Sequence, residues 1–441
     1  MPDILHLKPT DIDTAEKRAR LRVCIVGCGQ IGVSQAISFA EAGFRVSCTD
    51  ADQSLLRKLT KGGAVVSEQE IRGFVRAGTL NTSDDVKGAV AQSDVTLLTS
   101  GAKIDEKGNL EFLEAESNCK QIGAGLQRGA LVVFAGLAGF GFTEGVVKET
   151  LESVSGLKAG KDFGLAYFHG EVGEAKHNAV STVAANDQAS LDAASLIFSA
   201  TTKSIVRQIP CVKLGEVVTL FTASRRTLSR AFTNEFAVLC EKAGLDIFEV
   251  LKSIDVDLKQ ADSLPTITDD GKKETALLLE CAENLEVKLR LAKLGMQVNQ
   301  DIMRHAVNLT QSVLRDCGKT LRRARIAVLG TASQGTSQEA FVKMLIAKGA
   351  RINIYSPRGA KGKESTPLVV PKRSLVEAVE SCDCIVFLTF EEQFKRLSLK
   401  SLRSVTKLPA AVVDLAGLFE RERVESEGFL YSGLGKGVER R

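Results

Sequence analysis

The sequence predicts an α/β protein with an N-terminal Rossmann-type parallel sheet, a helical middle and a second Rossmann-like domain at the C-terminus. Residues 22–50 read strand, glycine turn, helix, strand, and a stretch without strand signals begins at Gly215. The strand and helix alternation then restarts at Arg325. Such alternation implies parallel sheets covered on both faces. We therefore expect a lead-in at 1–21 and domains at 22–210, 211–320 and 321–441.

The first α/β segment opens with one βαβ unit. The strand RVCIVG is followed by the turn CGQIG, the helix VSQAISFAEAG and the strand RVSCTD. Further strands are predicted at DVTLLTS (94–100) and ALVVFAG (130–136), each preceded by an amphipathic segment of helix length. The parallel sheet of this domain is therefore predicted to continue beyond its first unit.

The glycine turn has the spacing Gly27-x-Gly29-x-x-Gly32 at the end of a strand and the start of a helix. In a dinucleotide-binding turn the first glycine permits the tight turn, the second lets backbone approach the pyrophosphate and the third lets helix pack on strand. The helix N-terminus supplies unpaired N–H groups and a positive dipole end for the phosphates. The alternative is a glycine turn kept for packing alone, and Cys28 is interpreted as a small spacer.

Asp50 ends the second strand, eighteen residues after Gly32. A carboxylate there accepts hydrogen bonds from both ribose hydroxyls and repels a 2′-phosphate, so the cofactor is predicted to be NAD rather than NADP. The predicted cofactor-binding residues are Gly27, Cys28, Gly29, Gln30, Ile31, Gly32, Asp50, Thr99 and Ser100.

The middle of the chain is predicted to be helical. From Gly215 to Ile254 apolar residues recur at helical spacing, and a second helical stretch runs from Glu274 to Cys317. Apolar residues of 220–240 line more than one face of the first helix, so we expect a homodimer. The alternative is that the flanking domains cover this surface within a monomer.

The C-terminal segment repeats the α/β pattern. Its strands are predicted at RIAVLG (from Arg325), RINIYSP, CDCIVFLT (382–389) and AAVVDLAG (410–417), with a helix through Phe341 to Lys348 after the first of them.

Composition excludes several classes of protein. The chain is 44% hydrophobic and 25% charged, and no apolar run approaches the ~20 residues that cross a bilayer. Residues 1–22 have neither an apolar signal core nor a transit-peptide composition. A net charge of +4 is small for 441 residues and does not indicate nucleic-acid binding. A soluble protein without a nucleic-acid or membrane partner is expected.

The ten cysteines are spread along the chain without a disulfide framework, which favours reduced thiols and a cytoplasmic location. The pair Cys382 and Cys384 could ligate a metal, but we identify no second pair and no histidine partner with zinc-site spacing. We therefore predict no metal site.

Several strings are similar to those of one enzyme family. LTSGAKIDEKGNLEF (98–112) keeps an Asp-x-x-Gly turn at Asp105 and Gly108, and TNEFAVLCEKAGLDIFEVLKSI (233–254) resembles a central helix with Asn234-Glu235 in register. CDCIVFLTFEEQFKRLSLKSL, AAVVDLAGLF and GFLYSGLGKG follow near the end. From about Arg22 to Gly437 the chain resembles the UDP-glucose/GDP-mannose dehydrogenase family.

This resemblance implies an NAD-dependent oxidoreductase that acts on a CH–OH group of a nucleotide sugar, in a dimeric protein. Members of that family oxidise a primary alcohol twice, through an aldehyde and a cysteine-bound thioester, to a uronate. The chemistry requires a thiolate to capture the aldehyde, a lysine and an aspartate for the alcohol proton and the oxyanion, and a glutamate to activate water.

The positions that resemble the family's chemical residues carry other side chains. The cysteine loop corresponds to TITDDGKKE (266–274), which has no cysteine, and the nearest thiol, Cys281, lies in an apolar helical run. The lysine falls on Thr219 and the nearby asparagine on Ala223. Thr and Ala are poor replacements, since neither is an acid or base near neutral pH.

The remaining motifs of the family differ as well. Its catalytic glutamate falls near Tyr167, and its Ser-Thr string appears as AGLAGFGFTEG (135–145), where only Thr143-Glu144 is similar. The segment GTASQGT (330–336) is shortened where the family carries a lysine and an arginine for the sugar nucleotide, and Asp-Gly-Arg-Asn appears as Asp414-Leu-Ala-Gly417. The resemblance thus implies a retained scaffold with an altered active site.

Three hypotheses follow. The favoured one is a diverged NAD-binding oxidoreductase that makes no uronate by the cysteine route, with Glu171 and Glu174 as candidate catalytic residues and His169, His177 and Glu274 as further candidates. The second is a catalytically inactive NAD- or nucleotide-sugar-binding scaffold or sensor. The third is redox chemistry with tightly held NAD regenerated in place, as in some sugar epimerases.

Overall fold

A computed structural model describes residues 4–50, 73–104, 110–170, 179–254, 264–268, 271–332, 336–357 and 369–437. These residues form two compact units. Unit 1 comprises residues 1–222 and 276–287, and unit 2 comprises residues 223–275 and 288–441. Residues 211–320, predicted as a central helical domain, contribute to both units.

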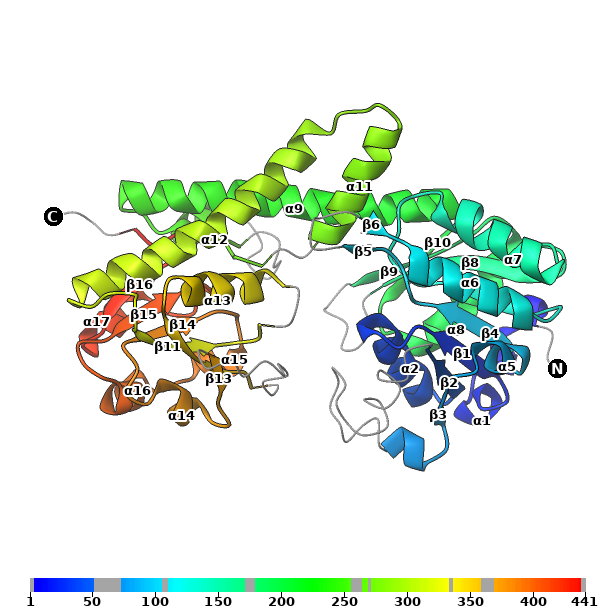
Figure 1. The fold of residues 1–441 in the computed structure, drawn as a ribbon, viewed down its shortest axis with the longest axis horizontal. Coiled ribbons are helices and arrows are strands. Elements are labelled where there is room, and N and C mark those ends of the chain that lie inside the picture. The colour runs from blue at the N-terminus through cyan, green and yellow to red at the C-terminus, as the bar shows by residue number, and fades with distance from the viewer. Residues whose placement is uncertain are drawn as a thin grey trace. The chain divides into compact units, whose positions relative to one another are not determined.

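Unit 1 is built on an eight-stranded sheet with the order β10-β9-β8-β7-β4-β1-β2-β3 (Figure 1). The strands are β1 (Arg22–Val26), β2 (Arg45–Thr49), β3 (Leu80–Ser83), β4 (Val95–Leu98), β7 (Leu131–Phe134), β8 (Gly164–His169), β9 (Val180–Ala185) and β10 (Ile205–Ile209). Neighbours pair in parallel except β8 and β9, which are antiparallel. The predicted parallel N-terminal sheet is confirmed, and one antiparallel pair is added to it.

Helices cover both faces of this sheet, because successive strand residues point to opposite sides. Val23 and Ile25 pack with α2 (Gln30–Glu41) and α8 (Gln188–Thr201). Cys24 and Val26 pack with the opposite layer of helices. That layer contains α5 (Val86–Ala91), α6 (Leu113–Gly125) and α7 (Glu149–Ser155). Burial on both faces explains why these strands read as continuous apolar runs.

Smaller elements complete unit 1. They are η1 (Ile4–His6), η2 (Pro9–Asp11), α1 (Ala15–Arg18), a hairpin of β5 (Lys103–Ile104) and β6 (Leu110–Glu111), and the π-helical turn η3 (Thr143–Lys148) directly before α7. The π-helical turn follows the loop after β7, and this loop is described below with the candidate site.

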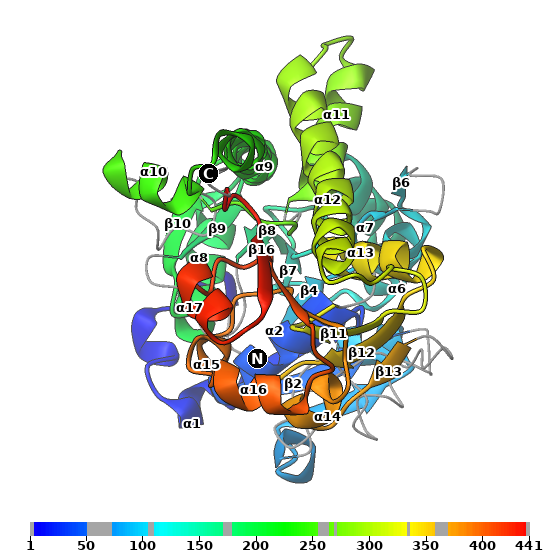
Figure 2. The same cartoon turned by 90° about the vertical axis from the view of Figure 1, so that its left-hand side faces the viewer.

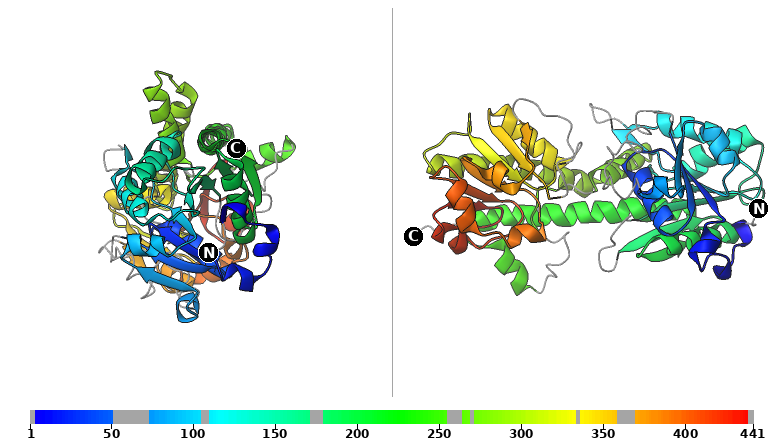
Figure 3. Two further views of the ribbon diagram at one scale, coloured as in Figure 1. Left: turned by 90° about the vertical axis from the view of Figure 1, so that its right-hand side faces the viewer. Right: turned by 90° about the horizontal axis from the view of Figure 1, so that it is seen from below.

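In the described part of the middle, each of the two predicted helical stretches is divided into two helices. Helix α9 (Val212–Ala243) is one uninterrupted helix of 32 residues, drawn in green in Figure 3. Gly244, with φ +75°, ends it, and the Asp246 side chain caps α10 (Ile247–Ser253). Similarly, α11 (Lys272–Asn284) and α12 (Arg290–Asp316) are separated at Glu286, whose φ is +58°. Left-handed backbone cannot continue an α-helix, so each predicted stretch is broken there.

Unit 2 contains a six-stranded, wholly parallel sheet with the order β13-β12-β11-β14-β15-β16. The strands are β11 (Arg325–Leu329), β12 (Arg351–Tyr355), β13 (Val369–Pro371), β14 (Cys384–Phe387), β15 (Ala411–Asp414) and β16 (Leu430–Gly433). This confirms the predicted second α/β domain.

The helices α12 and α13 (Ser337–Ala347) pack on one face of the second sheet, as Figure 2 shows. The helices α14 (Leu375–Val379), α15 (Glu392–Lys395), α16 (Leu399–Val405) and α17 (Arg421–Ser426) contribute to the opposite face. Cys382 packs in this second layer and Cys384 in the first, so the two thiols lie on opposite sides of the sheet. They cannot ligate one metal ion together.

Each of the ten cysteines is a free thiol. Within the described part of the chain, no helix combines the length and apolarity that a membrane crossing requires.

A candidate dinucleotide site and the groups around it

The turn after β1 is fixed by two glycines and one threonine. Gly27 has φ +101°, and a Cβ there would lie 2.9 Å from Thr99 Oγ1. The Thr99 hydroxyl donates to the carbonyl oxygen of Gly27 at 2.6 Å. A Cβ on Gly32 would overlap that same carbonyl oxygen, so helix α2 reaches the strand only because Gly32 has no side chain.

Gly29 is open. It is the exposed residue before α2, with an ordinary φ of −69°, and a Cβ there would have no atom within 4 Å. Within the described residues, no side-chain hydrogen bond caps this helix N-terminus. The free space and the unpaired N–H groups of the first turn are what a pyrophosphate requires.

Asp50 follows β2 and is buried. Its Oδ2 accepts a hydrogen bond from the Cys28 backbone N–H at 2.6 Å, so the carboxylate holds the turn as well as marking the end of β2. Residues 51–72, which follow it, lie outside the described residues. The glycine turn, the open helix N-terminus and this acid together fit the adenine-nucleotide half of NAD.

Cys28 is a neutral thiol within the turn. The neighbouring Cys48 thiol and burial both raise the pKa of Cys28 far above its ordinary value. Because the thiolate is the reactive form of cysteine, Cys28 is an unreactive small residue at this position.

The other predicted cofactor residues lie along the same edge of the sheet. Ser100 follows Thr99 after β4, and its hydroxyl accepts a hydrogen bond from Asn118 Nδ2 at 3.0 Å. Ile31 is exposed on the first turn of α2, and Gln30 begins that helix. The structure therefore gathers the nine predicted residues at the carboxyl ends of β1, β2 and β4.

A buried glutamate, Glu216, organises the loop after β7. Its Oε1 accepts from the Thr143 N–H at 3.0 Å and from the Thr143 hydroxyl at 2.6 Å, and its Oε2 accepts from the Gly141 N–H at 2.5 Å. Glu216 lies near the start of α9, and burial raises the pKa of its carboxyl. Glu216 was not predicted from the sequence, where its one local signal is a charged residue among apolar neighbours in GEVVTLF.

The Cys281 thiol lies beside this loop. It lies on α11 and is half-buried, and a Cβ on Gly139 would be 2.6 Å from its sulfur. Burial raises the pKa of the Cys281 thiol, a hydrogen bond from the Phe140 backbone lowers it, and the carboxylates of Glu280 and Glu216 raise it further. A raised pKa favours the protonated thiol over the thiolate, which is the nucleophilic form.

Thr219, Ala223 and Tyr167, the positions predicted to correspond to the family's polar residues, are buried. Thr219 is buried, and its hydroxyl donates back to the Gly215 carbonyl of its own helix at 3.1 Å. Ala223 is buried on the same helix. Tyr167 lies in β8 with its ring 6.2 Å from that of Phe134 and is part of the core.

Asp414 has a structural position at the end of β15. It is buried and accepts hydrogen bonds from the N–H groups of Ala416, Leu418 and Phe419. Burial raises the pKa of this carboxyl. The carboxylate thus shapes the turn through Gly417, whose φ is +66°.

The structure describes some of the candidate catalytic residues and not others. Glu171, Glu174 and His177 lie outside the described residues. His169 ends β8 and is half-buried, and Glu274 is half-buried in the first turn of α11. Of the five candidates, the structure therefore describes His169, in unit 1, and Glu274, in unit 2.

Two family models match this chain. Residues 21–189 match the NAD binding domain of the UDP-glucose/GDP-mannose dehydrogenase family, and residues 333–421 match the UDP binding domain of the same family.

Proteins of known function match over nearly the full length. The chain is 25% identical to "UDP-glucose 6-dehydrogenase" of Rhizobium meliloti, covering 94% of this chain and 100% of that protein. It is 24% identical to "UDP-N-acetyl-D-mannosamine dehydrogenase" of Pyrococcus horikoshii, covering 95% and 100%. Among solved structures, a UDP-D-ManNAc dehydrogenase from Pyrococcus horikoshii superimposes with a TM-score of 0.76 at 22% identity, over 95% of this chain and 100% of that one. A UDP-glucose dehydrogenase from Pyrobaculum islandicum gives 0.74 at 20% identity, over 94% and 98%.

Proposed function

Because the chain belongs to the UDP-glucose/GDP-mannose dehydrogenase family and carries its NAD-binding domain, we propose that it is an NAD-dependent oxidoreductase whose reaction does not pass through a cysteine thioester. The substrate class is a nucleotide sugar, supported by the UDP-binding domain match and by the names of the relatives. When bound, NAD supplies the hydride acceptor for oxidation of a CH–OH group.

The cofactor half of the proposal rests on the turn geometry. Gly29 leaves room for a pyrophosphate at the start of α2, and Asp50 lies where a ribose diol binds. We propose that Gly27, Cys28, Gly29, Gln30, Ile31, Gly32, Asp50, Thr99 and Ser100 hold NAD.

The observation that carries the non-cysteine route is the state of Cys281. Its sulfur packs against Gly139 and its pKa is raised, whereas capture of an aldehyde needs a thiolate about 3–3.5 Å from the carbonyl carbon. Thr219 provides no substitute for a proton-transferring lysine, because its hydroxyl is bonded to its own helix. General acid–base help of that kind is worth ~10²–10⁴-fold in rate.

The test is an assay with NAD and a panel of UDP- and GDP-sugars, in which NADH and uronate are both measured. We expect no formation of two NADH per sugar, and we expect Cys281→Ser to leave any NADH formation unchanged. Two NADH per sugar, abolished by Cys281→Ser, would overturn the proposal. Turnover lost on mutation of Glu171 or Glu174 would support a relocated carboxylate, whereas NAD binding without any NADH would favour the scaffold or sensor hypothesis.

We also propose that the protein is a homodimer in a reducing, cytoplasmic compartment. Phe232, Phe236 and Leu239 recur at helical spacing on α9 and are exposed. The ten free thiols support the compartment.

A further inference from the structure

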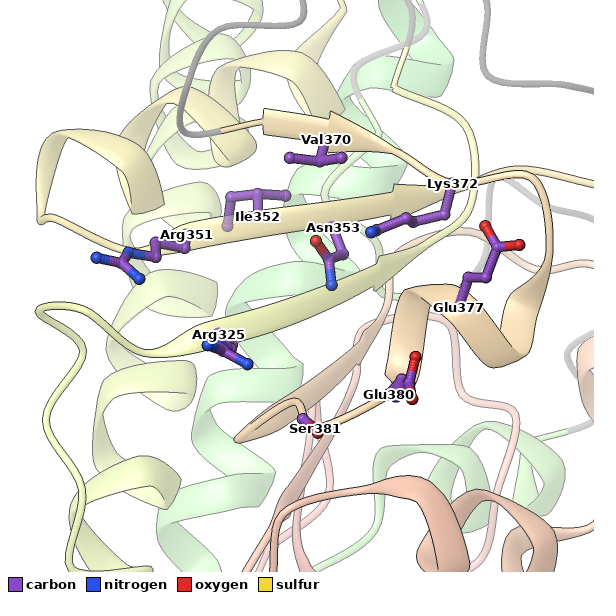
Figure 4. A pocket seen from close by; sticks show the side chains of 9 residues that line it. All are labelled: Arg325, Arg351, Ile352, Asn353, Val370, Lys372, Glu377, Glu380 and Ser381. Atoms are coloured by element: carbon purple, nitrogen blue, oxygen red, sulfur yellow. The ribbon is translucent and has the colours of Figure 1, made fainter.

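A pocket of about 340 Å³ lies in unit 2, on the sheet face that carries α14. Figure 4 shows its lining, which consists of Arg325, Arg351, Ile352, Asn353, Val370, Lys372, Glu377, Glu380 and Ser381. Arg325 and Arg351 are the first residues of β11 and β12. The arginine side of the pocket is therefore at the amino ends of β11 and β12, whereas ligands of open α/β sheets bind at the carboxyl ends.

The two arginines lie directly opposite one another. Arg325 and Arg351 are register partners in the parallel pair β11–β12, and both are exposed. Like charges in this arrangement repel. Among the described residues neither guanidinium has an ion pair. The nearby Asp383 accepts instead from the Arg325 backbone N–H at 2.9 Å and pairs with Lys319 at 2.9 Å.

Lys372 adds a third positive charge. Its backbone N–H is fixed to the Ile354 carbonyl at 2.9 Å, and its side chain extends toward Asn353 in Figure 4. Asn353 donates from Nδ2 to the Ala378 carbonyl at 3.1 Å, which ties the pocket floor to α14. In the described part of the chain, Lys372 also has no ion pair.

The opposite wall is acidic. Glu377 lies in the first turn of α14 and Glu380 directly follows the helix, and neither pairs with a pocket cation within the described ranges. Glu377 has one weak bond, from the Arg373 N–H at 3.4 Å. The pocket therefore presents unpaired donors for an anion on one side and unpaired carboxylate acceptors on the other.

We propose that this pocket binds the phosphate monoester of a small polyhydroxylated molecule, a sugar phosphate. Two guanidinium forks and an ammonium suit a dianionic phosphate, and Glu377 and Glu380 accept from hydroxyl groups of the ligand body. The volume is at the low end of the range for ligand pockets, which favours a hexose monophosphate over a nucleotide. This binding is independent of the proposed oxidoreductase activity.

The test is titration calorimetry on the full-length protein, saturated with NAD so that the glycine turn is occupied. The probes are glucose 6-phosphate, inorganic phosphate and glucose. We expect one saturable site for glucose 6-phosphate, weaker binding of inorganic phosphate and none of glucose. The double variant Arg325→Gln/Arg351→Gln should weaken glucose 6-phosphate by ~10–100-fold, the size expected for charge-assisted hydrogen bonds.

The matched control is Arg315→Gln/Arg396→Gln, which removes two exposed arginines of unit 2 outside the pocket and should leave the affinity unchanged. Glu380→Gln should reduce the difference in affinity between glucose 6-phosphate and inorganic phosphate. Lys372→Gln provides a second loss of charge if the double variant unfolds. The proposal would be overturned if glucose 6-phosphate showed no saturable binding, or if the arginine double variant bound it as tightly as the wild type. Equal affinities of the wild type for glucose and glucose 6-phosphate would also overturn it. If these variants keep the NAD affinity of the wild type, a failure of the sugar-phosphate proposal is distinguished from a failure of the dehydrogenase proposal.

Discussion

At the scale of single residues, the Glu216 carboxylate is held in a buried loop contact, and this predicts a specific pH dependence. Burial raises its pKa in the folded protein above the ordinary 4.5. Folding therefore favours the protonated form: the stability contribution of Glu216 is complete below about pH 4.5 and is lost as pH rises through the folded-state pKa. Glu216→Gln stays neutral, so the wild-type minus variant free energy of unfolding should fall across this window.

Urea denaturation at a series of pH values measures that difference, because the other carboxyl groups cancel in it. Glu235→Gln on the same helix is the control for loss of a glutamate, since its side chain is exposed. If the wild-type minus Glu216→Gln free energy of unfolding did not change with pH, burial would not be what sets the pKa of this carboxyl.

Asp50 sets a second expectation at this scale, concerning cofactor choice. Asp50→Arg removes the acceptor for the ribose hydroxyls and adds a partner for a 2′-phosphate. NAD affinity should fall by ~10–100-fold, and NADP should be relatively favoured. Asp50→Asn is the milder comparison, since an amide oxygen still accepts from Cys28 N–H. Calorimetry with both cofactors measures this; equal affinities in the wild type and in Asp50→Arg would contradict the role of Asp50.

At the scale of elements, two glycines of the turn between β1 and α2 have different roles: Gly32 is needed for packing and Gly29 for cofactor binding. A Cβ on Gly32 overlaps the Gly27 carbonyl, so Gly32→Ala should lower the free energy of unfolding by ~1–3 kcal/mol. A Cβ on Gly29 meets no atom within 4 Å, so Gly29→Ala should leave stability unchanged and weaken NAD alone. Thermal unfolding without cofactor, followed by NAD titration, tests both. Equal loss of stability in the two variants would refute this division.

Strands and helices that depend on residues close together in the chain could be predicted from the sequence pattern. The βαβ unit at 22–50 and the strands from Arg325 onward follow from apolar runs separated by glycine turns and helical periods. The antiparallel strand β9 was not predicted, because its partner and direction depend on long-range pairing. The contacts of Glu216 have the same origin: its partners Gly141 and Thr143 are 75 and 73 residues away. The register of Arg325 with Arg351 likewise emerges only once the strands pair.

At the scale of the whole molecule, the apolar face of α9 predicts self-association. Phe232 and Phe236 are 65% and 41% exposed, and their ring centroids are 5.3 Å apart, while Leu239 is 56% exposed. Light scattering at micromolar concentration should give about twice the chain mass of 47.3 kDa. Phe232→Glu/Phe236→Glu should reduce it to the single-chain mass, because a buried interface does not accept unpaired charges. Val370→Glu, an exposed apolar residue on β13, is the control. A wild-type monomer would contradict the prediction.

The division of the chain into units has a consequence for biosynthesis. Unit 1 ends at residue 222 and then takes up residues 276–287, after residues 223–275 of unit 2. A nascent chain that has emerged to residue 222 therefore lacks the helix that places Cys281 against Gly139. Domains generally fold as units during synthesis, N-terminal first. Here the first unit is completed only when residue 287 has left the ribosome, so no contiguous gene fragment encodes either unit alone.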